Sequence, residues 1–195
     1  MFERELRDLS YVPRWSIVRV AKPQSVAEHS FFVAMYADQI AEIISWRHRG
    51  NRENLMRAAL WHDVEECFTG DIPGPTKRKI MSNEFINTVE EGNRIRFGNK
   101  YKITLKPQEK IILKTAGLLD EALFLAGEIQ RGNMACKHVF KYVLTRLHKA
   151  CMQLPGLLVN KLYDSYVIPA ITKELRGYSH EEQNDEDLAT KINTV

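Results

Sequence analysis

The chain has 195 residues, 44% hydrophobic and 27% charged, a composition that is ordinary for a globular protein and excludes a disordered chain. This length suits one domain. The 28 basic residues nearly balance the 25 acidic ones, so the net charge of +3 predicts neither stable nucleic-acid binding nor attraction to a membrane surface.

The first predicted helix begins after Ser25. Ser25 and Glu28 have the spacing of a capping box, and apolar side chains then recur at helical intervals as far as Ile44. We expect Gly50 and Asn51 to end this helix. A second helix is predicted over residues 52–68, "RENLMRAALWHDVEECF".

The segment 71–79, "DIPGPTKRK", predicts a loop because it contains two prolines and a glycine. Strand patterns are nearly absent, and further helices are predicted over residues 82–96, 107–131, 134–152 and 157–175. The expected fold is all-α, a single compact bundle of about six helices within residues 1–176. Residues 177–195 are polar and are expected to form a flexible tail.

Four titratable side chains fall at or near positions that should face the core. His29, His62 and Asp120 lie among apolar residues at helical spacing, and Asp63 follows His62 about 100° around the helix. A lone histidine there is usually a hydrogen-bonded core residue, and a lone aspartate usually pairs with an arginine or a helix end. Inward carboxylates are costly unless paired or bound to metal. One divalent cation would satisfy all four, and these ligands suit Zn, Mn, Fe, Co or Ni.

The cysteines give no alternative metal site. Cys67, Cys136 and Cys151 are an odd set without a CxxC pair, which argues against a disulfide framework and a cysteine-rich zinc site. The N-terminal segment has no apolar run typical of a signal peptide, and no stretch reaches the roughly 18 apolar residues of a membrane span. We therefore expect a cytoplasmic protein.

Several short motifs together resemble the HD-domain phosphohydrolases. These are "EHS" at 28–30, "WHD" at 61–63, "E..TGD" at 66–71, and Asp120 in a later helix. A His-Asp doublet alone is common, but the ordered set on helices is specific. The resemblance implies that His29, His62, Asp63 and Asp120 hold one divalent metal, whose identity the ligand types leave open.

A second set of motifs resembles one branch of that superfamily, the bacterial 5′-deoxynucleotidases and the phage dATP triphosphohydrolases. The motifs are "PRW" at 13–15, "SVAEHS" at 25–30, "TGD" at 69–71 and "P.P.K" at 73–77. The similarity runs from about Leu9 to about Leu125, over most of the chain's first two thirds. It implies a deoxynucleotide substrate, a homo-oligomer (dimer or hexamer), and the cytoplasm of a bacterium or phage-infected cell.

The residues after "RW" favour one substrate slightly. The monophosphatases continue with proline and leucine, whereas this chain continues "SIV", so that Ile17 is closer to the phage enzymes. We therefore expect a triphosphohydrolase that releases deoxynucleoside and triphosphate from dATP. The alternative is a 5′-deoxynucleotidase that dephosphorylates deoxynucleoside monophosphates.

The resemblance and phosphoryl chemistry assign roles around the metal. Glu66 is expected to orient or deprotonate water, with Asp71 as the second candidate. Glu66 could instead pair with Arg57 or Lys77, and Asp71 could cap a turn.

Substrate contacts are assigned in the same way. Arg14 and Lys77 are expected to bind phosphate, and Trp15 to form a wall that leaves no room for a 2′-hydroxyl. Ile17 and Pro75 would border the base. Trp15 could equally be a core residue.

Two readings without catalysis stay open. The same ligands could hold a structural metal in a helical binding module, although such a site needs no neighbouring carboxylates like Glu66 and Asp71. A nucleic-acid-binding helical module would predict weak binding that depends steeply on salt.

Overall fold

The structure is a computed structural model that describes residues 4–44, 49–79, 81–98, 101–154 and 162–176. The predicted tail at 177–195 lies outside these ranges. The described residues form no strand, and their α-helices are α1 (Val26–Ile43), α2 (Arg49–Trp61), α3 (Glu66–Thr69), α4 (Gly74–Lys79), α5 (Asn83–Phe97), α6 (Pro107–Gln130), α7 (Lys137–Cys151) and α9 (Ile168–Arg176). The all-α prediction is confirmed, with somewhat more helices than six.

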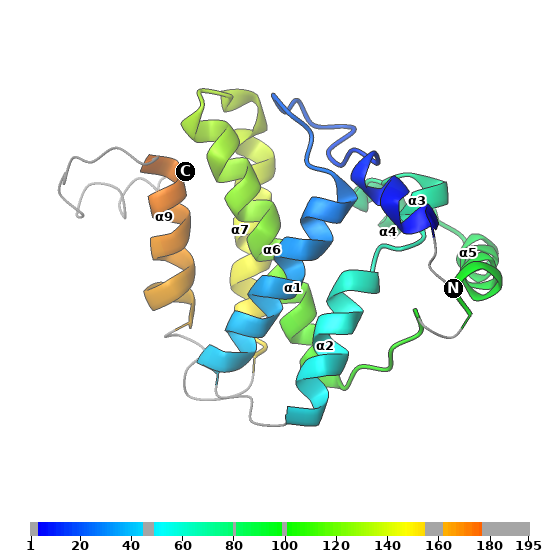
Figure 1. Cartoon of the computed structure of the whole chain (residues 1–195). Coiled ribbons are helices and arrows are strands. Elements are labelled where there is room, and N and C mark those ends of the chain that lie inside the picture. Colours follow the sequence, from blue (N-terminus) through cyan, green and yellow to red (C-terminus); the bar gives the residue numbers. More distant parts are fainter. Residues whose placement is uncertain (1–3, 45–48, 80, 99–100, 155–161, 177–195) are drawn as a thin grey trace.

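Helix α6 is the centre of the bundle. It packs against α1, α7, α9 and α2 (Figure 1). Its inward positions carry apolar side chains without exposed surface, among them Ile112, Ala116 and Leu125. Burying such side chains is the main favourable term that holds the helices together. In the ranges described, no helix is long and apolar enough to cross a bilayer.

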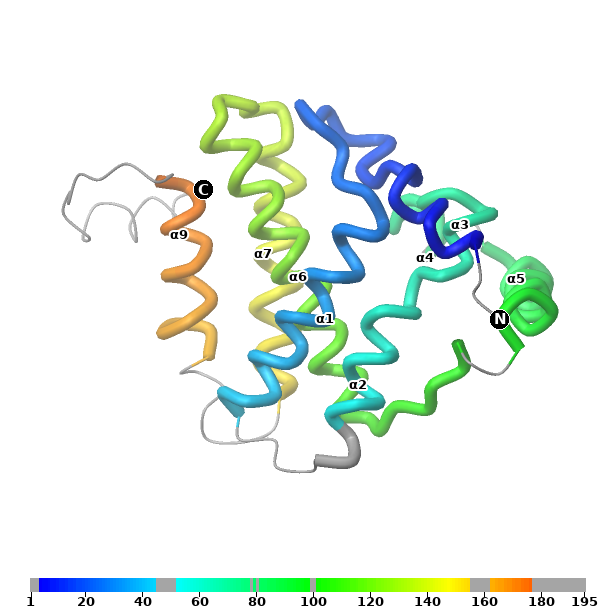
Figure 2. The backbone as a smooth tube through the Cα atoms, in the orientation of Figure 1, coloured from blue at the N-terminus to red at the C-terminus, as the bar shows by residue number. Residues whose placement is uncertain are grey.

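The N-terminal segment runs along one end of the bundle before it enters α1. A short 3₁₀ helix, Arg4–Ser10, lies against α1 and α3, and Figure 2 shows the chain passing above α3 and α4 toward the start of α1. A single antiparallel bridge joins Pro13 to Ser25. This bridge brings the residues after Pro13 close to the first turn of α1, where His29 lies.

Helix α1 begins as predicted and ends earlier than predicted. The Ser25 hydroxyl accepts the N–H of Glu28 at 3.1 Å, and the Glu28 carboxylate accepts the N–H of Ser25 at 2.7 Å, so the capping box is formed. The predicted end at Gly50 and Asn51 is wrong, because both residues lie in the first turn of α2. Gly and Asn are tolerated there, since the first backbone N–H groups of a helix have no partner within it.

The single helix predicted over residues 52–68 is interrupted at the His-Asp doublet. Nδ1 of His62 donates to the carbonyl of Ala59 at 2.7 Å. In a continuous α-helix that carbonyl would accept the N–H of Asp63, so the side chain competes with the backbone ladder. The chain then tightens into i→i−3 bonds, such as Glu66 N–H to the carbonyl of Asp63 at 3.1 Å, before α3 begins.

The loop predicted over 71–79 is wrong from Gly74 onward, where α4 begins. Pro75 lies in the first turn of this helix, where the missing N–H costs nothing and the fixed φ suits a helix. The N–H of Lys77 donates to the carbonyl of Pro73 at 3.0 Å. The side chain of Lys77 is therefore carried on a short helix and not on an irregular loop.

The last described segment contains a π-helical turn, Tyr163–Val167, that continues into α9. Pro169, two residues after this turn, has no N–H to donate, so the regular ladder of helical hydrogen bonds is broken there. The predicted helix at 157–175 thus agrees with the structure from residue 162, and its first residues lie outside the described ranges.

Candidate metal centre and substrate cavity

Three of the predicted ligands form one cluster at the end of the bundle. His29 comes from the first turn of α1, and His62 and Asp63 come from the turn after α2. Nε2 of His62 is 3.1 Å and Nε2 of His29 is 3.8 Å from Oδ2 of Asp63. One donor atom from each residue lies within 4.8 Å of the other two. The three residues fit the imidazole and carboxylate set that binds divalent transition metals.

The contacts of the other ring nitrogens explain why both Nε2 atoms point toward Asp63. Nδ1 of His29 lies 2.5 Å from Oδ2 of Asp120, and Nδ1 of His62 donates to the Ala59 carbonyl. Metal-binding histidines commonly have one nitrogen engaged in this way, which fixes the tautomer and aims the other nitrogen at the ion. The orientation of both rings therefore suits a cation placed beside Asp63.

Asp120 lies behind His29 and is not part of the cluster of donor atoms. Its carboxylate is buried and accepts hydrogen bonds from Nε2 of Gln24 at 3.1 and 3.0 Å, and Nη1 of Arg14 is 3.7 Å away. A carboxylate in this position supports a histidine ligand. Direct ligation by Asp120 stays a prediction.

The protonation states of His29 and Asp63 favour metal binding, whereas that of His62 opposes it. Burial lowers the pKa of His29 to about 4, so its ring is neutral at pH 7. Burial opposes ionisation of Asp63, but the neighbouring His62 and Lys77 outweigh it and lower the pKa of Asp63. Burial alone would lower the pKa of His62, yet the Asp63 carboxylate raises it. A cation would compete with that proton, because metal ligands must be deprotonated.

Glu66 and Lys77 form an ion pair at the edge of the cluster. The Glu66 side chain is 1% exposed, and its Oε1 accepts from Nζ of Lys77 at 2.6 Å. The same Nζ lies 3.8 Å from Oδ1 of Asp63. Burial is the main cause that raises the pKa of Glu66, and Oε2 of Glu66 has no hydrogen-bond partner among the described residues. The pairing with Lys77 thus leaves one buried carboxylate oxygen free to bind water.

Two adjoining cavities surround these residues. The first has a volume of about 410 Å³, and its lining includes His29, His62, Asp63, Glu66 and Lys77; we call it the metal cavity. The second has a volume of about 350 Å³ and is mainly apolar; we call it the apolar cavity. We call their shared lining the neck, which consists of Arg14, Asp71, Gly74, Glu121 and Arg146.

The metal cavity has an excess of cations on its outer side. Lys110 and Lys114 lie one turn apart on α6, line this cavity and are exposed. Neither forms an ion pair with a described residue, in contrast to Lys77. These two ammonium groups can therefore bind an anion without first breaking a salt bridge.

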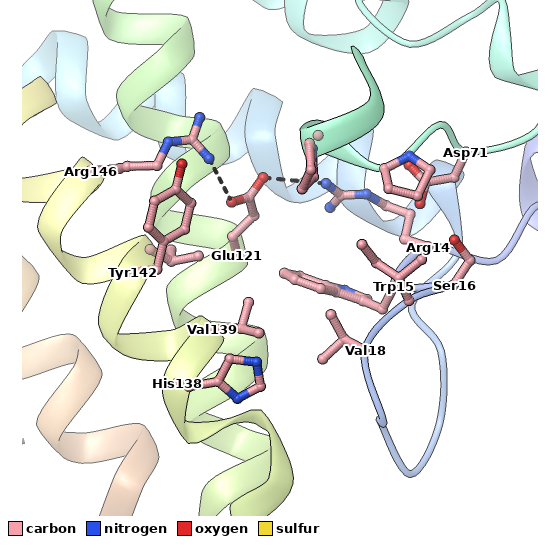
Figure 3. A pocket seen from close by; sticks show the side chains of 15 residues that line it. Arg14, Trp15, Ser16, Val18, Asp71, Glu121, His138, Val139, Tyr142 and Arg146 are labelled. Carbon is pink, nitrogen blue, oxygen red and sulfur yellow. Dashed lines mark ion pairs between the residues drawn. The ribbon is translucent and has the colours of Figure 1, made fainter. Parts of the chain in front are cut away.

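The apolar cavity contains the predicted sugar and base residues. Trp15, Ile17 and Pro75 line it together with Val139 and Tyr142 of α7, and Figure 3 shows the Trp15 ring pointing toward Val139. The Trp15 ring stacks on Phe124 of α6, with 5.3 Å between centroids and 6° between planes. Trp15 is thus both packed on the bundle and part of the cavity wall, so the two roles considered for it are compatible.

The backbone at Trp15 is strained. Its φ of 71° makes it the only non-glycine residue with positive φ among those the structure describes. A bulky side chain in this conformation costs of order 1–3 kcal/mol and persists where the surroundings hold it, commonly at functional sites. The stacking on Phe124 supplies part of that restraint.

Arg14 and Asp71 lie at the neck. Nη1 of Arg14 donates to Oε1 of Gln24 at 3.2 Å, and Nη2 lies 3.5 Å from Oε1 of Glu121. Burial raises the pKa of Asp71, although a backbone hydrogen bond with Trp15 and the nearby Arg14 and Lys77 oppose the shift. Both side chains therefore face the two cavities from the N-terminal segment and the α3–α4 connection.

Comparison with known proteins agrees with this geometry. The family model of the YfbR-like 5′-deoxynucleotidases matches residues 1–166. The chain belongs to this family. It is an HD-domain phosphohydrolase and a metal-dependent hydrolase.

Individual relatives span the two enzyme types. The chain is 29% identical to a 5′-deoxynucleotidase YfbR of Salmonella arizonae over 164 residues, 76% of this chain and 80% of the relative. It is 36% identical to a dATP triphosphohydrolase of Salmonella phage PMBT28 over 101 residues, 46% and 50% of the two chains.

A solved structure shares the fold. The HD phosphohydrolase DatZ of cyanophage S-2L, determined with dA and one catalytic Zn²⁺, superposes with a TM-score of 0.70 at 19% identity, covering 88% of this chain and 97% of DatZ. The chain thus shares its overall fold with this solved structure.

Sequence reasoning missed several residues of this HD-domain site. Three of them could have been recognised from helical spacing. Lys110, Lys114 and Glu121 share one helical stripe of α6 at intervals of four and seven residues. Gln24 and Arg146 gave no such signal, because they approach the site only through tertiary packing.

Proposed function

We propose that the chain hydrolyses 2′-deoxynucleoside triphosphates such as dATP at the α-phosphorus, releasing the deoxynucleoside and inorganic triphosphate. The observation that carries this proposal is that two lysines on the outer side of the metal cavity, Lys110 and Lys114, form no ion pair with any residue the structure describes. A monophosphate needs charge neutralisation only next to the metal. A triphosphate extends its negative charge further, and these two ammonium groups extend the positive lining in the same direction.

His29, His62 and Asp63 would hold the metal, with Asp120 either behind His29 or as a further ligand. A divalent cation bound there supplies a Lewis acid for the phosphoryl oxygens. The identity of this ion is open among Zn, Co, Mn, Fe and Ni, because imidazole and carboxylate ligands suit all of them.

Glu66 would accept the proton of the attacking water. Its free Oε2 is buried beside the cluster, and a raised pKa makes a carboxylate a better base near neutral pH. As water attacks the α-phosphorus, the bond to the 5′ oxygen breaks, and that oxygen leaves with the deoxynucleoside after taking up a proton. Asp71, whose pKa burial also raises, lies at the neck and is the second candidate for proton transfer.

The two cavities would take the two ends of the nucleotide. The base and deoxyribose would lie in the apolar cavity against Trp15, Ile17 and Pro75, and the phosphates would lie in the metal cavity with Arg14 and Lys77. A tryptophan face close to C2′ of the sugar would disfavour the extra hydroxyl of a ribonucleotide. Sites of this kind are mostly apolar with a few placed polar groups.

The decisive experiment identifies products. Purified protein is incubated with dATP, dAMP, ATP and AMP in the presence of Co²⁺, Mn²⁺ or Zn²⁺, and the products are separated by anion exchange. We expect deoxyadenosine and triphosphate from dATP. Absence of hydrolysis of every deoxynucleotide would refute a nucleotide phosphohydrolase.

The second candidate is a 5′-deoxynucleotidase, which the family model and the Salmonella arizonae relative favour. It predicts deoxyadenosine and single phosphate from dAMP, with no cleavage of dATP. Both functions use the same metal, Glu66 and neck, so they differ only in what Lys110 and Lys114 bind.

A further inference from the structure

The neck between the two cavities is lined by two arginines that share one carboxylate. Glu121 of α6 lies between Arg14 and Arg146, with 3.5 Å from Oε1 to Nη2 of Arg14 and 3.9 Å from Oε2 to Nη1 of Arg146 (Figure 3). All three side chains line both cavities. They come from the N-terminal segment, α6 and α7, so the neck joins three parts of the chain.

Arg146 is well placed to bind a ligand. Its side chain is 33% exposed, and its guanidinium lies 5.6 Å from the centre of the Tyr142 ring, which restricts its position. At 3.9 Å its ion pair with Glu121 is too long to be a hydrogen bond. The guanidinium therefore keeps donors free for an incoming anion, and a guanidinium has five of them.

A nucleotide that occupies both cavities must pass its 5′ end through the neck. If the base lies against Trp15 and the phosphates lie beside the metal cluster, the atoms between them pass Arg14 on one side and Arg146 on the other. Two guanidiniums on opposite sides can grip the oxygens of one phosphate, and bidentate guanidinium–phosphate pairs are strong and directional.

We propose that Arg146 is a second phosphate-binding arginine, which acts with Arg14 on the phosphate nearest the sugar, and that Glu121 is a positioning residue for both. This inference rests on the proposed function, because it assumes a 5′-nucleotide substrate. It holds for a monophosphate or a triphosphate, since both have a phosphate at this place.

Glu121 suits this role because its carboxylate attracts both guanidiniums and offsets part of their mutual repulsion before substrate arrives. Its side chain is 22% exposed, so the charge is partly shielded from water and its attraction to the guanidiniums is stronger than at a free surface. Phosphate would then bind the guanidinium donors that Glu121 does not contact, chiefly those of Arg146.

The test compares Arg146→Ala with Lys149→Ala, a control that removes an exposed cation from the same helix outside both cavities. For the wild type and each variant, KM and kcat are measured with the deoxynucleotide that the wild type hydrolyses best. Inhibition constants are measured for deoxyadenosine and for inorganic triphosphate. Thermal unfolding and bound metal are recorded to show that each variant folds and loads the ion.

We expect Arg146→Ala to raise KM about 10- to 100-fold, the effect of losing a hydrogen bond between charged groups. The kcat should stay within about threefold, and Arg146→Lys should recover part of the loss. Triphosphate should inhibit the Arg146→Ala variant less strongly than the wild type. Deoxyadenosine should inhibit the wild type and the variant equally, because it has no phosphate for Arg146 to bind. A merely structural defect would weaken inhibition by deoxyadenosine as well.

Glu121→Gln tests the positioning role in two backgrounds. We expect it to raise KM by a larger factor in the wild type than in the Arg146→Ala variant, because part of its effect passes through Arg146. Equal factors in both backgrounds would overturn that role. An unchanged KM in Arg146→Ala, with a wild type that turns over deoxynucleotides, would overturn phosphate binding by Arg146, whereas an inactive wild type would refute the proposed function instead.

Discussion

Nδ1 of His29 lies 2.5 Å from Oδ2 of Asp120, so the ring of His29 is held from behind by a carboxylate while its Nε2 faces Asp63. This arrangement predicts a graded effect on metal binding. Asp120→Asn should weaken metal affinity about 10- to 100-fold, as loss of a supporting carboxylate does. His62→Ala removes a donor atom and should abolish binding at the same metal concentration. Titration with Co²⁺, followed by its visible absorption, measures both.

The comparison also decides how Asp120 acts. If Asp120→Asn lost the metal as completely as His62→Ala, Asp120 would be a direct ligand, as the resemblance to HD-domain enzymes implies. If His62→Ala kept both metal and activity, the assignment of the whole cluster would be refuted.

The free oxygen of Glu66 predicts a separation between metal binding and catalysis. Glu66→Ala and Glu66→Gln should retain the metal, because Glu66 is not part of the donor cluster. Turnover should fall about 10²- to 10⁴-fold, which is the usual contribution of a general base. Metal content by elemental analysis and kcat with the preferred deoxynucleotide measure the two effects. A Glu66→Gln variant with wild-type kcat would contradict the assigned role.

The stacking of Trp15 on Phe124 predicts where sugar selectivity resides. Trp15→Ala should lower the ratio of kcat/KM for dATP over ATP about tenfold, since a shaped apolar wall can reject an added hydroxyl by about 100-fold at most. Tyr11→Ala is the matched control, because Tyr11 is an exposed aromatic residue of the same segment that lines neither cavity. Equal ratios in the Trp15 variant and wild type would argue for a purely structural tryptophan.

Much of the site was predictable because local patterns position it. The capping box of Ser25 and Glu28 sets where α1 begins, and this fixes the helical face on which His29 lies. The turn at the His-Asp doublet was not predictable from periodicity. The helix is interrupted because the His62 side chain hydrogen-bonds the Ala59 carbonyl in place of the backbone, and the spacing of apolar residues does not reveal this bond.

Long-range packing explains why some site residues could not be predicted from the sequence. Arg146 comes 132 residues after Arg14, and nothing local relates them. Packing of α7 on α6 brings Arg146 to Glu121, and the N-terminal segment brings Arg14 to the same carboxylate. Lys110 and Lys114 could have been found from their shared helical face with Glu121. Their importance depends on the cavity, which only the fold creates.

The buried carboxylate of Glu128 predicts an acid-dependent loss of stability. Glu128 accepts the N–H of Ala21 and an amide hydrogen of Asn133, both at 2.6 Å, and so ties the N-terminal segment to the end of α6. Burial opposes ionisation, but these hydrogen bonds and Arg131 outweigh it and lower the pKa of Glu128 below its usual 4.5. The group is thus ionised in the folded state at pH values where the unfolded chain is protonated.

The sign of the pH effect follows from that difference. The stabilisation is complete above about pH 4.5 and is lost as the pH falls through the lower pKa of the folded state. Glu128→Gln should reduce the free energy of unfolding at pH 7 by about 1–3 kcal/mol, with a smaller difference from wild type at pH 3. Urea unfolding at both pH values measures this, with the exposed Glu84→Gln as control. A constant difference at both pH values would contradict the linkage.

Lys110 and Lys114 of α6, which pair with no described residue, predict that their loss changes KM more for a triphosphate than for a monophosphate substrate. In the double variant Lys110→Ala/Lys114→Ala, the KM for dATP should rise about 10-fold or more, because each lost contact between an ammonium and a phosphate oxygen removes a charge-assisted hydrogen bond. The KM for dAMP, if the protein hydrolyses it, should change less than twofold, since in the proposed placement its single phosphate would reach no further than Lys77. Lys141→Ala, an exposed cation of α7 outside both cavities, should behave as wild type. Because both lysines lie at the surface, a change in KM cannot be attributed to a disturbed core. An unchanged KM for dATP would remove the structural reason to prefer the triphosphate as substrate.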